Sequence, residues 1–96
     1  MNLDDKNKLK NLLNELYEAQ KRASFADRTM QVFIEKIKLT EEEAVQMLHK
    51  MIEEGWLVVD KYKMKFLKRP GYIFNFPVVI SKEGLKIIKK SGEGER

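Results

Sequence analysis

The sequence contains no cysteine, and this absence removes several classes of site. Without thiols the chain can form no disulfide, no thiolate zinc site and no cysteine nucleophile. It has a single histidine and no glycine-rich phosphate-binding loop, so neither a metal cluster nor a positioned catalytic base is apparent. We therefore expect no metal, no cofactor and no enzymatic activity.

Long hydrophobic runs are also missing from the chain. No apolar stretch approaches the roughly 18 residues that a membrane-spanning helix requires. The acidic start, Met1–Asp5, lacks the apolar segment of a secretory signal. Together with the lack of cysteine, these features predict a cytoplasmic protein with no membrane partner.

The length and composition predict one small domain. With 96 residues, 43% of them hydrophobic, the chain can enclose one modest core. We expect this domain to occupy residues 1–90. Residues 91–96 contain two glycines and no apolar anchor, so they are predicted to form a disordered tail.

The positive net charge is unevenly distributed along the chain. The total is +4, but residues 40–55 carry a net −4 and residues 56–80 a net +4. A basic segment of this kind favours a polyanionic partner. A solvated, lysine-rich surface explains the same charges equally well.

Apolar residues that recur three and four positions apart predict two helices in the first part of the chain. The first extends from about Asp4 to Arg22. The second is capped near Ser24 and ends at about Lys38. The residues expected in the core from these helices are Leu9, Leu12, Leu13, Leu16, Tyr17, Met30, Phe33, Ile34 and Ile37.

Two further helices are predicted from their capping residues. Thr40 and Glu43 have the spacing of a capping box, in which each side chain bonds the backbone N–H of the other. This third helix ends at Gly55, because glycine enters the left-handed conformation without a steric cost. Ser81 is expected to cap a last helix that ends at about Lys90. The expected core residues here are Ala44, Val45, Leu48, Met51, Ile52, Leu85, Ile87 and Ile88.

Residues 57–67 and 72–80 alternate polar and apolar side chains, which predicts two strands of a hairpin around Pro70 and Gly71. The first strand would present a row of cations on one face, with more charge at the tip. Its opposite, apolar face would pair with the second strand. The expected pairs are Phe66 with Phe74, Met64 with Phe76, and Tyr62 with Val78.

This order of elements over residues 25–90 resembles a winged helix-turn-helix, an α+β fold with three helices, a β-hairpin wing and a C-terminal helix. The likeness is carried by the spacing from Thr40 to Leu57, and by the step Val79–Leu85, which is similar to that after the wing in MarR-like and PadR-like transcriptional regulators. The resemblance implies a dimeric regulator of transcription that binds double-stranded DNA. In such proteins the third helix enters the major groove and the wing lies along the backbone.

Two sets of residues are candidate DNA contacts on this interpretation. Polar side chains on the exposed face of the third helix could reach base edges. The cations of the hairpin could neutralise phosphates, with a log–log salt slope of about −4 to −5 if all five did so. Lysines on a strand face also protect an edge strand from aggregation, which is the structural alternative. The candidates are Gln46, His49, Lys50, Lys61, Lys63, Lys65, Lys68 and Arg69.

The third helix departs from the expected pattern because both of its ends are acidic. Carboxylates aimed at DNA are repelled by its phosphates. The alternative is therefore a winged-helix protein–protein interaction module, in which the acidic third helix docks a basic protein partner. A homodimer through the apolar stripes of the first and last helices is a further hypothesis, and internal packing explains the same stripes equally well.

Overall fold

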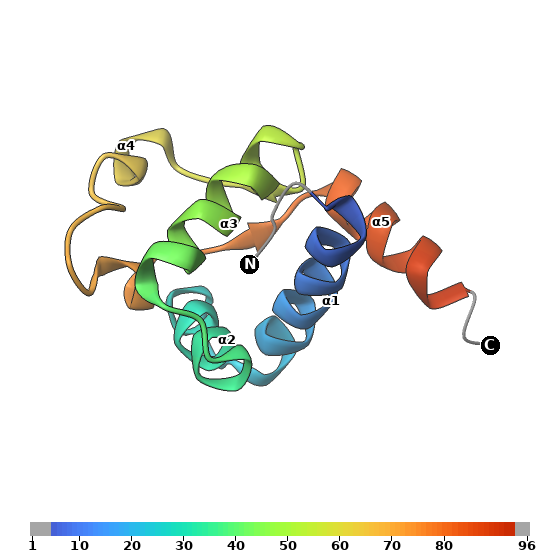
Figure 1. The fold of residues 1–96 in the computed structure, drawn as a ribbon, viewed down its shortest axis with the longest axis horizontal. Helices are drawn as coiled ribbons and strands as arrows, with labels where there is room; N and C mark the ends of the chain where they lie inside the picture. Colours follow the sequence, from blue (N-terminus) through green and yellow to red (C-terminus); the bar gives the residue numbers. More distant parts are fainter. Residues whose placement is uncertain (1–4, 94–96) are drawn as a thin grey trace.

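The structure is a computed structural model that describes residues 5–93, the side chains of residues 90–93 excepted. It is a mostly helical α+β domain with a two-stranded antiparallel sheet (Figure 1). The helices are α1 (Lys6–Arg22), α2 (Thr29–Ile37), α3 (Glu41–Glu53), α4 (Lys61–Met64) and α5 (Lys82–Glu93). The strands are β1 (Leu57–Val58) and β2 (Val79–Ile80), and the 3₁₀ turns are η1 (Ala26–Arg28) and η2 (Tyr72–Asn75).

The predicted first helix is confirmed as α1, which begins at Lys6. The side chain of Asp5 caps it, because Oδ1 accepts a hydrogen bond from the backbone N–H of Asn7 at 2.9 Å. The apolar side of α1 packs against α2 and α3. The core expected from the first two helices is buried, except that Tyr17 and Ile37 are half-buried.

The start of α2 differs from the prediction. Residues Ala26–Arg28 form the turn η1, and α2 begins only at Thr29, with no side-chain cap at either element. The prediction of a Ser24 cap is therefore wrong. Thr29, the first residue of α2, is completely buried, so the helix begins where the chain enters the core.

Both ends of α3 are confirmed. The backbone N–H of Glu43 donates to Thr40 Oγ1 at 3.1 Å, and the backbone N–H of Thr40 donates to Glu43 Oε1 at 3.0 Å. At the other end Gly55 has φ +78°, and the N–H of Trp56 donates to the carbonyl of Met51 at 2.9 Å. This left-handed ending turns the chain directly into β1.

The beginning of α5 is fastened to the end of α3 by Ser81, as its predicted capping role requires. Its hydroxyl accepts from the backbone N–H of Gly84 at 3.1 Å and donates to the carbonyl of Gly55 at 2.6 Å. The helix extends to Glu93, so it includes residues 91–93 of the predicted tail. The rest of that tail, residues 94–96, lies outside the described residues.

The predicted hairpin is wrong over most of its length. Only residues 57–58 and 79–80 are strands, paired as Leu57 with Ile80 and Val58 with Val79. The intervening chain contains α4 and η2 instead. The expected pairs Phe66–Phe74, Met64–Phe76 and Tyr62–Val78 therefore do not form.

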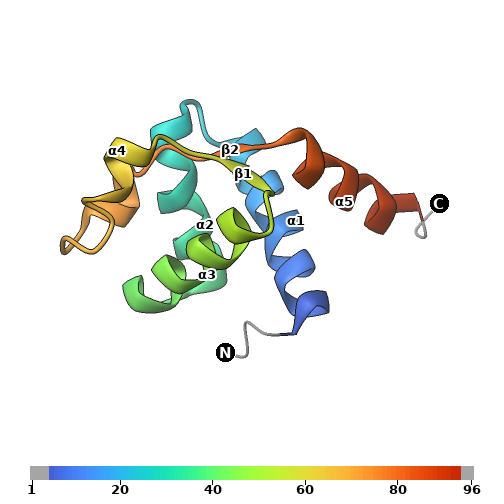
Figure 2. The ribbon, with the colours of Figure 1, turned by 90° about the horizontal axis from the view of Figure 1, so that it is seen from above.

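A local cap explains why this segment turns instead of extending. Asp60 Oδ1 accepts a hydrogen bond from the backbone N–H of Tyr62 at 2.8 Å, which begins α4. Most of the backbone hydrogen bonds that follow, from Lys65 to Phe76, join residues three positions apart, as in 3₁₀ turns. We call residues 60–76 the basic lobe. Figures 1 and 2 show that α4 and α5 lie at opposite ends of the molecule.

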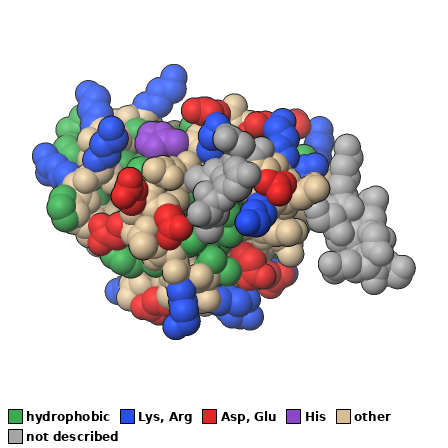
Figure 3. All heavy atoms as spheres, viewed as in Figure 1, with side chains coloured by type: hydrophobic (Ala, Val, Ile, Leu, Met, Phe, Trp, Pro, Cys, Tyr) green, Lys and Arg blue, Asp and Glu red, His purple; other side chains and the backbone are tan. Residues whose placement is uncertain are grey.

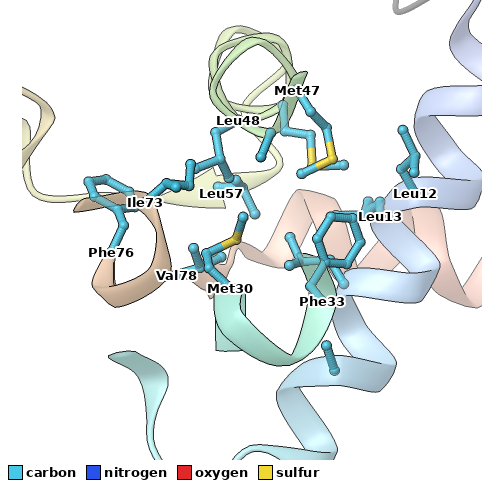
Figure 4. Packing of buried hydrophobic residues seen from close by; sticks show 14 of the residues in the cluster. Leu12, Leu13, Met30, Phe33, Met47, Leu48, Leu57, Ile73, Phe76 and Val78 are labelled. Atoms are coloured by element: carbon cyan, nitrogen blue, oxygen red, sulfur yellow. The ribbon is translucent and has the colours of Figure 1, made fainter. Parts of the chain in front are cut away.

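The lobe is attached to the core by its own apolar side chains. Leu67, Ile73 and Phe76 are each at most 1% exposed. In Figure 4, Ile73 points toward Leu48 of α3, and the Phe76 ring lies beside Ile73. The predicted apolar face is correct from Phe76 to β2, because Val78 and Ile80 are buried as well.

We predict that Gly84→Ala destabilises the protein, although alanine is the better helix former by about 1 kcal/mol. A Cβ at this position would collide with the carbonyl oxygen of Trp56 and lie 2.7 Å from Ile80 Cγ2. Overpacking against backbone should lower the free energy of unfolding by about 1–3 kcal/mol, measured by chemical denaturation. Asn11→Ala, on the exposed face of α1, is the control and should not be destabilising. A Gly84→Ala variant as stable as wild type would contradict the close contact.

The capping box predicts a pH dependence of stability. The hydrogen bond from the backbone of Thr40 holds the pKa of Glu43 below its ordinary value of 4.5. A lowered carboxyl pKa stabilises the folded state above the unfolded pKa, and this contribution is lost as the pH falls through the folded pKa. Between about pH 6 and pH 3, the melting temperature of wild type should fall more steeply than that of Glu43→Gln. Parallel curves would show that the carboxylate contributes nothing.

Candidate functional site

The predicted row of lysines does not exist as a strand face. Because residues 61–64 form α4, Lys61, Lys63 and Lys65 point around a helical turn and do not form one straight stripe. All three are nevertheless exposed, as are Lys68 and Arg69 further along the lobe. The residues predicted for phosphate contact thus share one protruding segment in a different arrangement.

These five cations have no carboxylate partner among the residues that the structure describes. The ion pairs there involve other lysines, such as Lys36 with Glu15 at 2.9 Å and Lys6 with Glu54 at 3.5 Å. Figure 3 shows lysine and arginine side chains gathered at the end of the molecule that carries α4, with the single histidine beside them. The lobe therefore presents five cations to solvent that form no ion pair with the described carboxylates.

A groove of about 580 Å³ separates the lobe from the exposed face of α3. Four of the eight candidate DNA contacts line this groove. Gln46 and His49 form one wall, and Lys68 and Arg69 lie opposite. Lys50, Lys63 and Lys65 do not line it, and Lys61 lines a different groove. The remaining residues of the wall and floor are Glu41, Glu42, Val45, Leu67 and Pro70.

The lobe is held beside α3 by a contact that sequence reasoning missed. Glu41 Oε2 accepts a hydrogen bond from the backbone N–H of Gly71 at 3.0 Å, across 30 positions of sequence. Gly71 has φ +80°, a conformation that glycine adopts without strain. The first turn of α3 thereby fixes the tip of the lobe, and no sequence pattern marks this pairing.

Aromatic residues of the lobe also differ from expectation. Tyr62 is predicted on the apolar face of the hairpin, opposite Val78, but it is 64% exposed. In α4 it lies one turn before Phe66, and the two ring centroids are 5.6 Å apart. The spacing of four residues in the sequence was the signal for this contact, and the alternation of lysines concealed it.

A second groove, of about 640 Å³, lies beside the sheet. Its walls come from the end of α3, from β1 and from α4, and they are mostly apolar. The lining residues are Ile52, Gly55, Leu57, Val58, Val59, Lys61, Met64 and Ser81. None of these side chains offers a nucleophile paired with a base.

The described part of the chain shows no metal-binding arrangement and no membrane-spanning helix. No group of three or more His, Cys, Asp or Glu side chains is placed there to hold a metal ion. None of the helices in residues 5–93 combines the length and apolar character needed to cross a bilayer. His49 belongs to no such cluster and simply lines the groove beside α3.

No protein-family model, curated protein or solved structure matches this chain.

We predict that removing the Glu41 carboxylate loosens the tip of the lobe. Glu41→Ala leaves the N–H of Gly71 without its acceptor, and the expected loss of stability is about 1 kcal/mol. The more specific measurement is amide hydrogen exchange at Gly71, which should become faster. Glu42→Ala is the matched control, because it removes a neighbouring carboxylate of the same groove without removing that bond. Equal exchange at Gly71 in both variants would contradict the anchoring role of Glu41.

Proposed function

We propose that this protein is a winged-helix domain that binds double-stranded DNA, with the basic lobe on the phosphate backbone and α3 facing the major groove. The order of α1, α2, α3, β1, β2 and α5 supports the fold assignment. The lobe takes the place of the hairpin wing between β1 and β2. A domain of this kind serves in transcription regulation in the proteins it resembles.

One observation carries the proposal: five exposed cations, without described carboxylate partners, protrude beside the exposed face of α3. Releasing counterions from DNA is the main source of affinity for such a surface. Across the groove from Lys68 and Arg69, Gln46 offers both a donor and an acceptor to a base edge. Phosphate contacts would thus orient the domain, and α3 would supply any base contacts.

Three of the five carboxylates at the ends of α3 are engaged by groups of the protein itself. Glu41 bonds Gly71, Glu43 bonds Thr40, and Glu54 pairs with Lys6. These contacts hold the carboxylates toward the protein's own groups, and the helix N-terminus offsets part of the charge. Glu42 and Glu53 are exposed and form no such contact among the described residues, so the alternative, an acidic docking face for a basic protein, stays a prediction.

Burial of apolar side chains removes one of the two surfaces that were considered for a homodimer. The apolar stripe of α1 is inside the domain, where Leu9, Leu13 and Leu16 are at most 2% exposed. Internal packing therefore accounts for that stripe. In α5, Leu85 is 36% exposed, so dimerisation through α5 stays a prediction.

Charge reversal in the lobe tests the proposal. We expect Lys63→Glu, Lys65→Glu and Arg69→Glu together to abolish the binding of duplex DNA, measured by fluorescence anisotropy. For wild type, raising the salt from about 50 to 200 mM should weaken binding steeply, with a log–log slope of about −4 to −5 if all five cations are engaged.

The matched control is Lys8→Glu, Lys82→Glu and Lys89→Glu, which reverses three exposed cations of α1 and α5. Both triple variants change the formal net charge from +4 to −2, so they differ only in where the charge lies. The control should retain most of the affinity. Equal losses of DNA affinity in the two triple variants would show that only net charge matters and would contradict a role for the lobe. Absent or salt-insensitive binding by wild type would overturn the proposal.

A further inference from the structure

Four aromatic rings form a continuous column through the basic lobe. The centroids of Tyr62 and Phe66 are 5.6 Å apart, those of Phe66 and Tyr72 are 6.0 Å apart, and those of Tyr72 and Phe76 are 6.1 Å apart. The rings meet edge to face or tilted, which is a favourable geometry for aromatic pairs. Phe76 is fully buried in the core and Tyr62 is 64% exposed, so the column extends from the core to the surface.

This column holds the outermost ring in place. Each ring packs against the next, and Phe76 is fixed by the hydrophobic core. Tyr62 also belongs to α4, whose first turn is capped by Asp60. An exposed ring with such support loses little conformational entropy when a ligand stacks on it.

Cations lie over the rings of the column. Lys65 Nζ is 5.4 Å from the centroid of the Tyr62 ring, and the guanidinium carbon of Arg69 is 4.5 Å from that of Phe66. These two cations thus lie beside an aromatic surface, and neither forms an ion pair with a described carboxylate. A ligand that matches this surface has flat rings and negative charges at short, regular intervals.

We infer that Tyr62 is a stacking platform for an unpaired base, and that the ligand of the lobe is a nucleic acid in which duplex adjoins single strand. The faces of paired bases are covered by their neighbours in a duplex, and only their edges are open in the grooves. Away from the ends of a duplex, a tyrosine ring can stack on a base only where the strand is unpaired, and such stacking tolerates any sequence. This inference rests on the proposed DNA binding and adds the class of DNA.

The test compares three DNA probes: a blunt duplex, the same duplex with a single-stranded oligo-dT extension, and the oligo-dT strand alone. Wild type should bind the extended duplex more tightly than the blunt one. Tyr62→Ala should weaken binding of the extended duplex about tenfold and leave the blunt duplex unchanged. Tyr62→Phe keeps the stacking surface and should bind like wild type.

Phe25→Ala is the matched control, because Phe25 is 70% exposed and belongs to the connection between α1 and α2, outside the lobe. It should bind all three probes like wild type. Circular dichroism should show that Tyr62→Ala melts like wild type, since the side chain is mostly exposed.

The outcomes separate this inference from the proposed function. If blunt duplex binds and the extension adds no affinity, or if Tyr62→Ala weakens both probes equally, the stacking role is wrong and duplex binding stands. If oligo-dT binds through Tyr62 and blunt duplex does not bind, the stacking role is supported and the proposed duplex binding is wrong. Failure of every DNA probe overturns both, as does Tyr62-dependent binding to vesicles of anionic lipid without binding to DNA.

Discussion

Burial of apolar side chains from the basic lobe is the interaction on which the site depends. Leu67, Ile73 and Phe76 are almost completely removed from solvent, and each such burial contributes about 1.5–3 kcal/mol. Without this burial, little would offset the conformational entropy of a segment that has five cations and no long helix or strand. Because they anchor the lobe, the hydrogen bond from Gly71 to Glu41 can set its distance from α3. The groove, the clustered cations and the aromatic column all follow from this attachment.

The parts of the fold that were predicted from sequence are those with local causes. The capping box at Thr40, the left-handed ending at Gly55 and the cap at Ser81 each act within a few residues, so the residues themselves reveal them. The predicted start of α2 is wrong because no side chain caps it, and the helix begins at Thr29, which is buried in the core.

The lobe was misinterpreted for a physical reason. Lysines at every second position over 61–65 match the period of a strand, but Tyr62 and Phe66 also match the four-residue period of a helix. The side chain of Asp60 favours the helical turn because it caps the backbone N–H of Tyr62. This single hydrogen bond is a weaker sequence signal than six alternating residues. The contact of Glu41 with Gly71 had no sequence signal at all, since 30 positions separate the two residues.

The sequence accordingly predicts which residues the candidate site contains, but it does not predict how they are arranged. The cations of the lobe are exposed as expected, and Gln46 and His49 do face Lys68 and Arg69. Their geometry is that of a compact lobe with an aromatic column, which a flat ribbon with a lysine row would lack. This difference matters for function, because a ribbon would offer only charge, whereas the lobe offers charge together with an exposed ring.

The conformation of the basic lobe is tested most directly by nuclear Overhauser effects in the free protein. If the lobe is a capped turn packed on the core, the spectra should contain contacts between the Tyr62 and Phe66 rings and between Ile73 and Leu48. Cross-strand contacts between the α-protons of Met64 and Phe76 would instead demonstrate an extended hairpin. That result would remove the groove, the column and the site built from them.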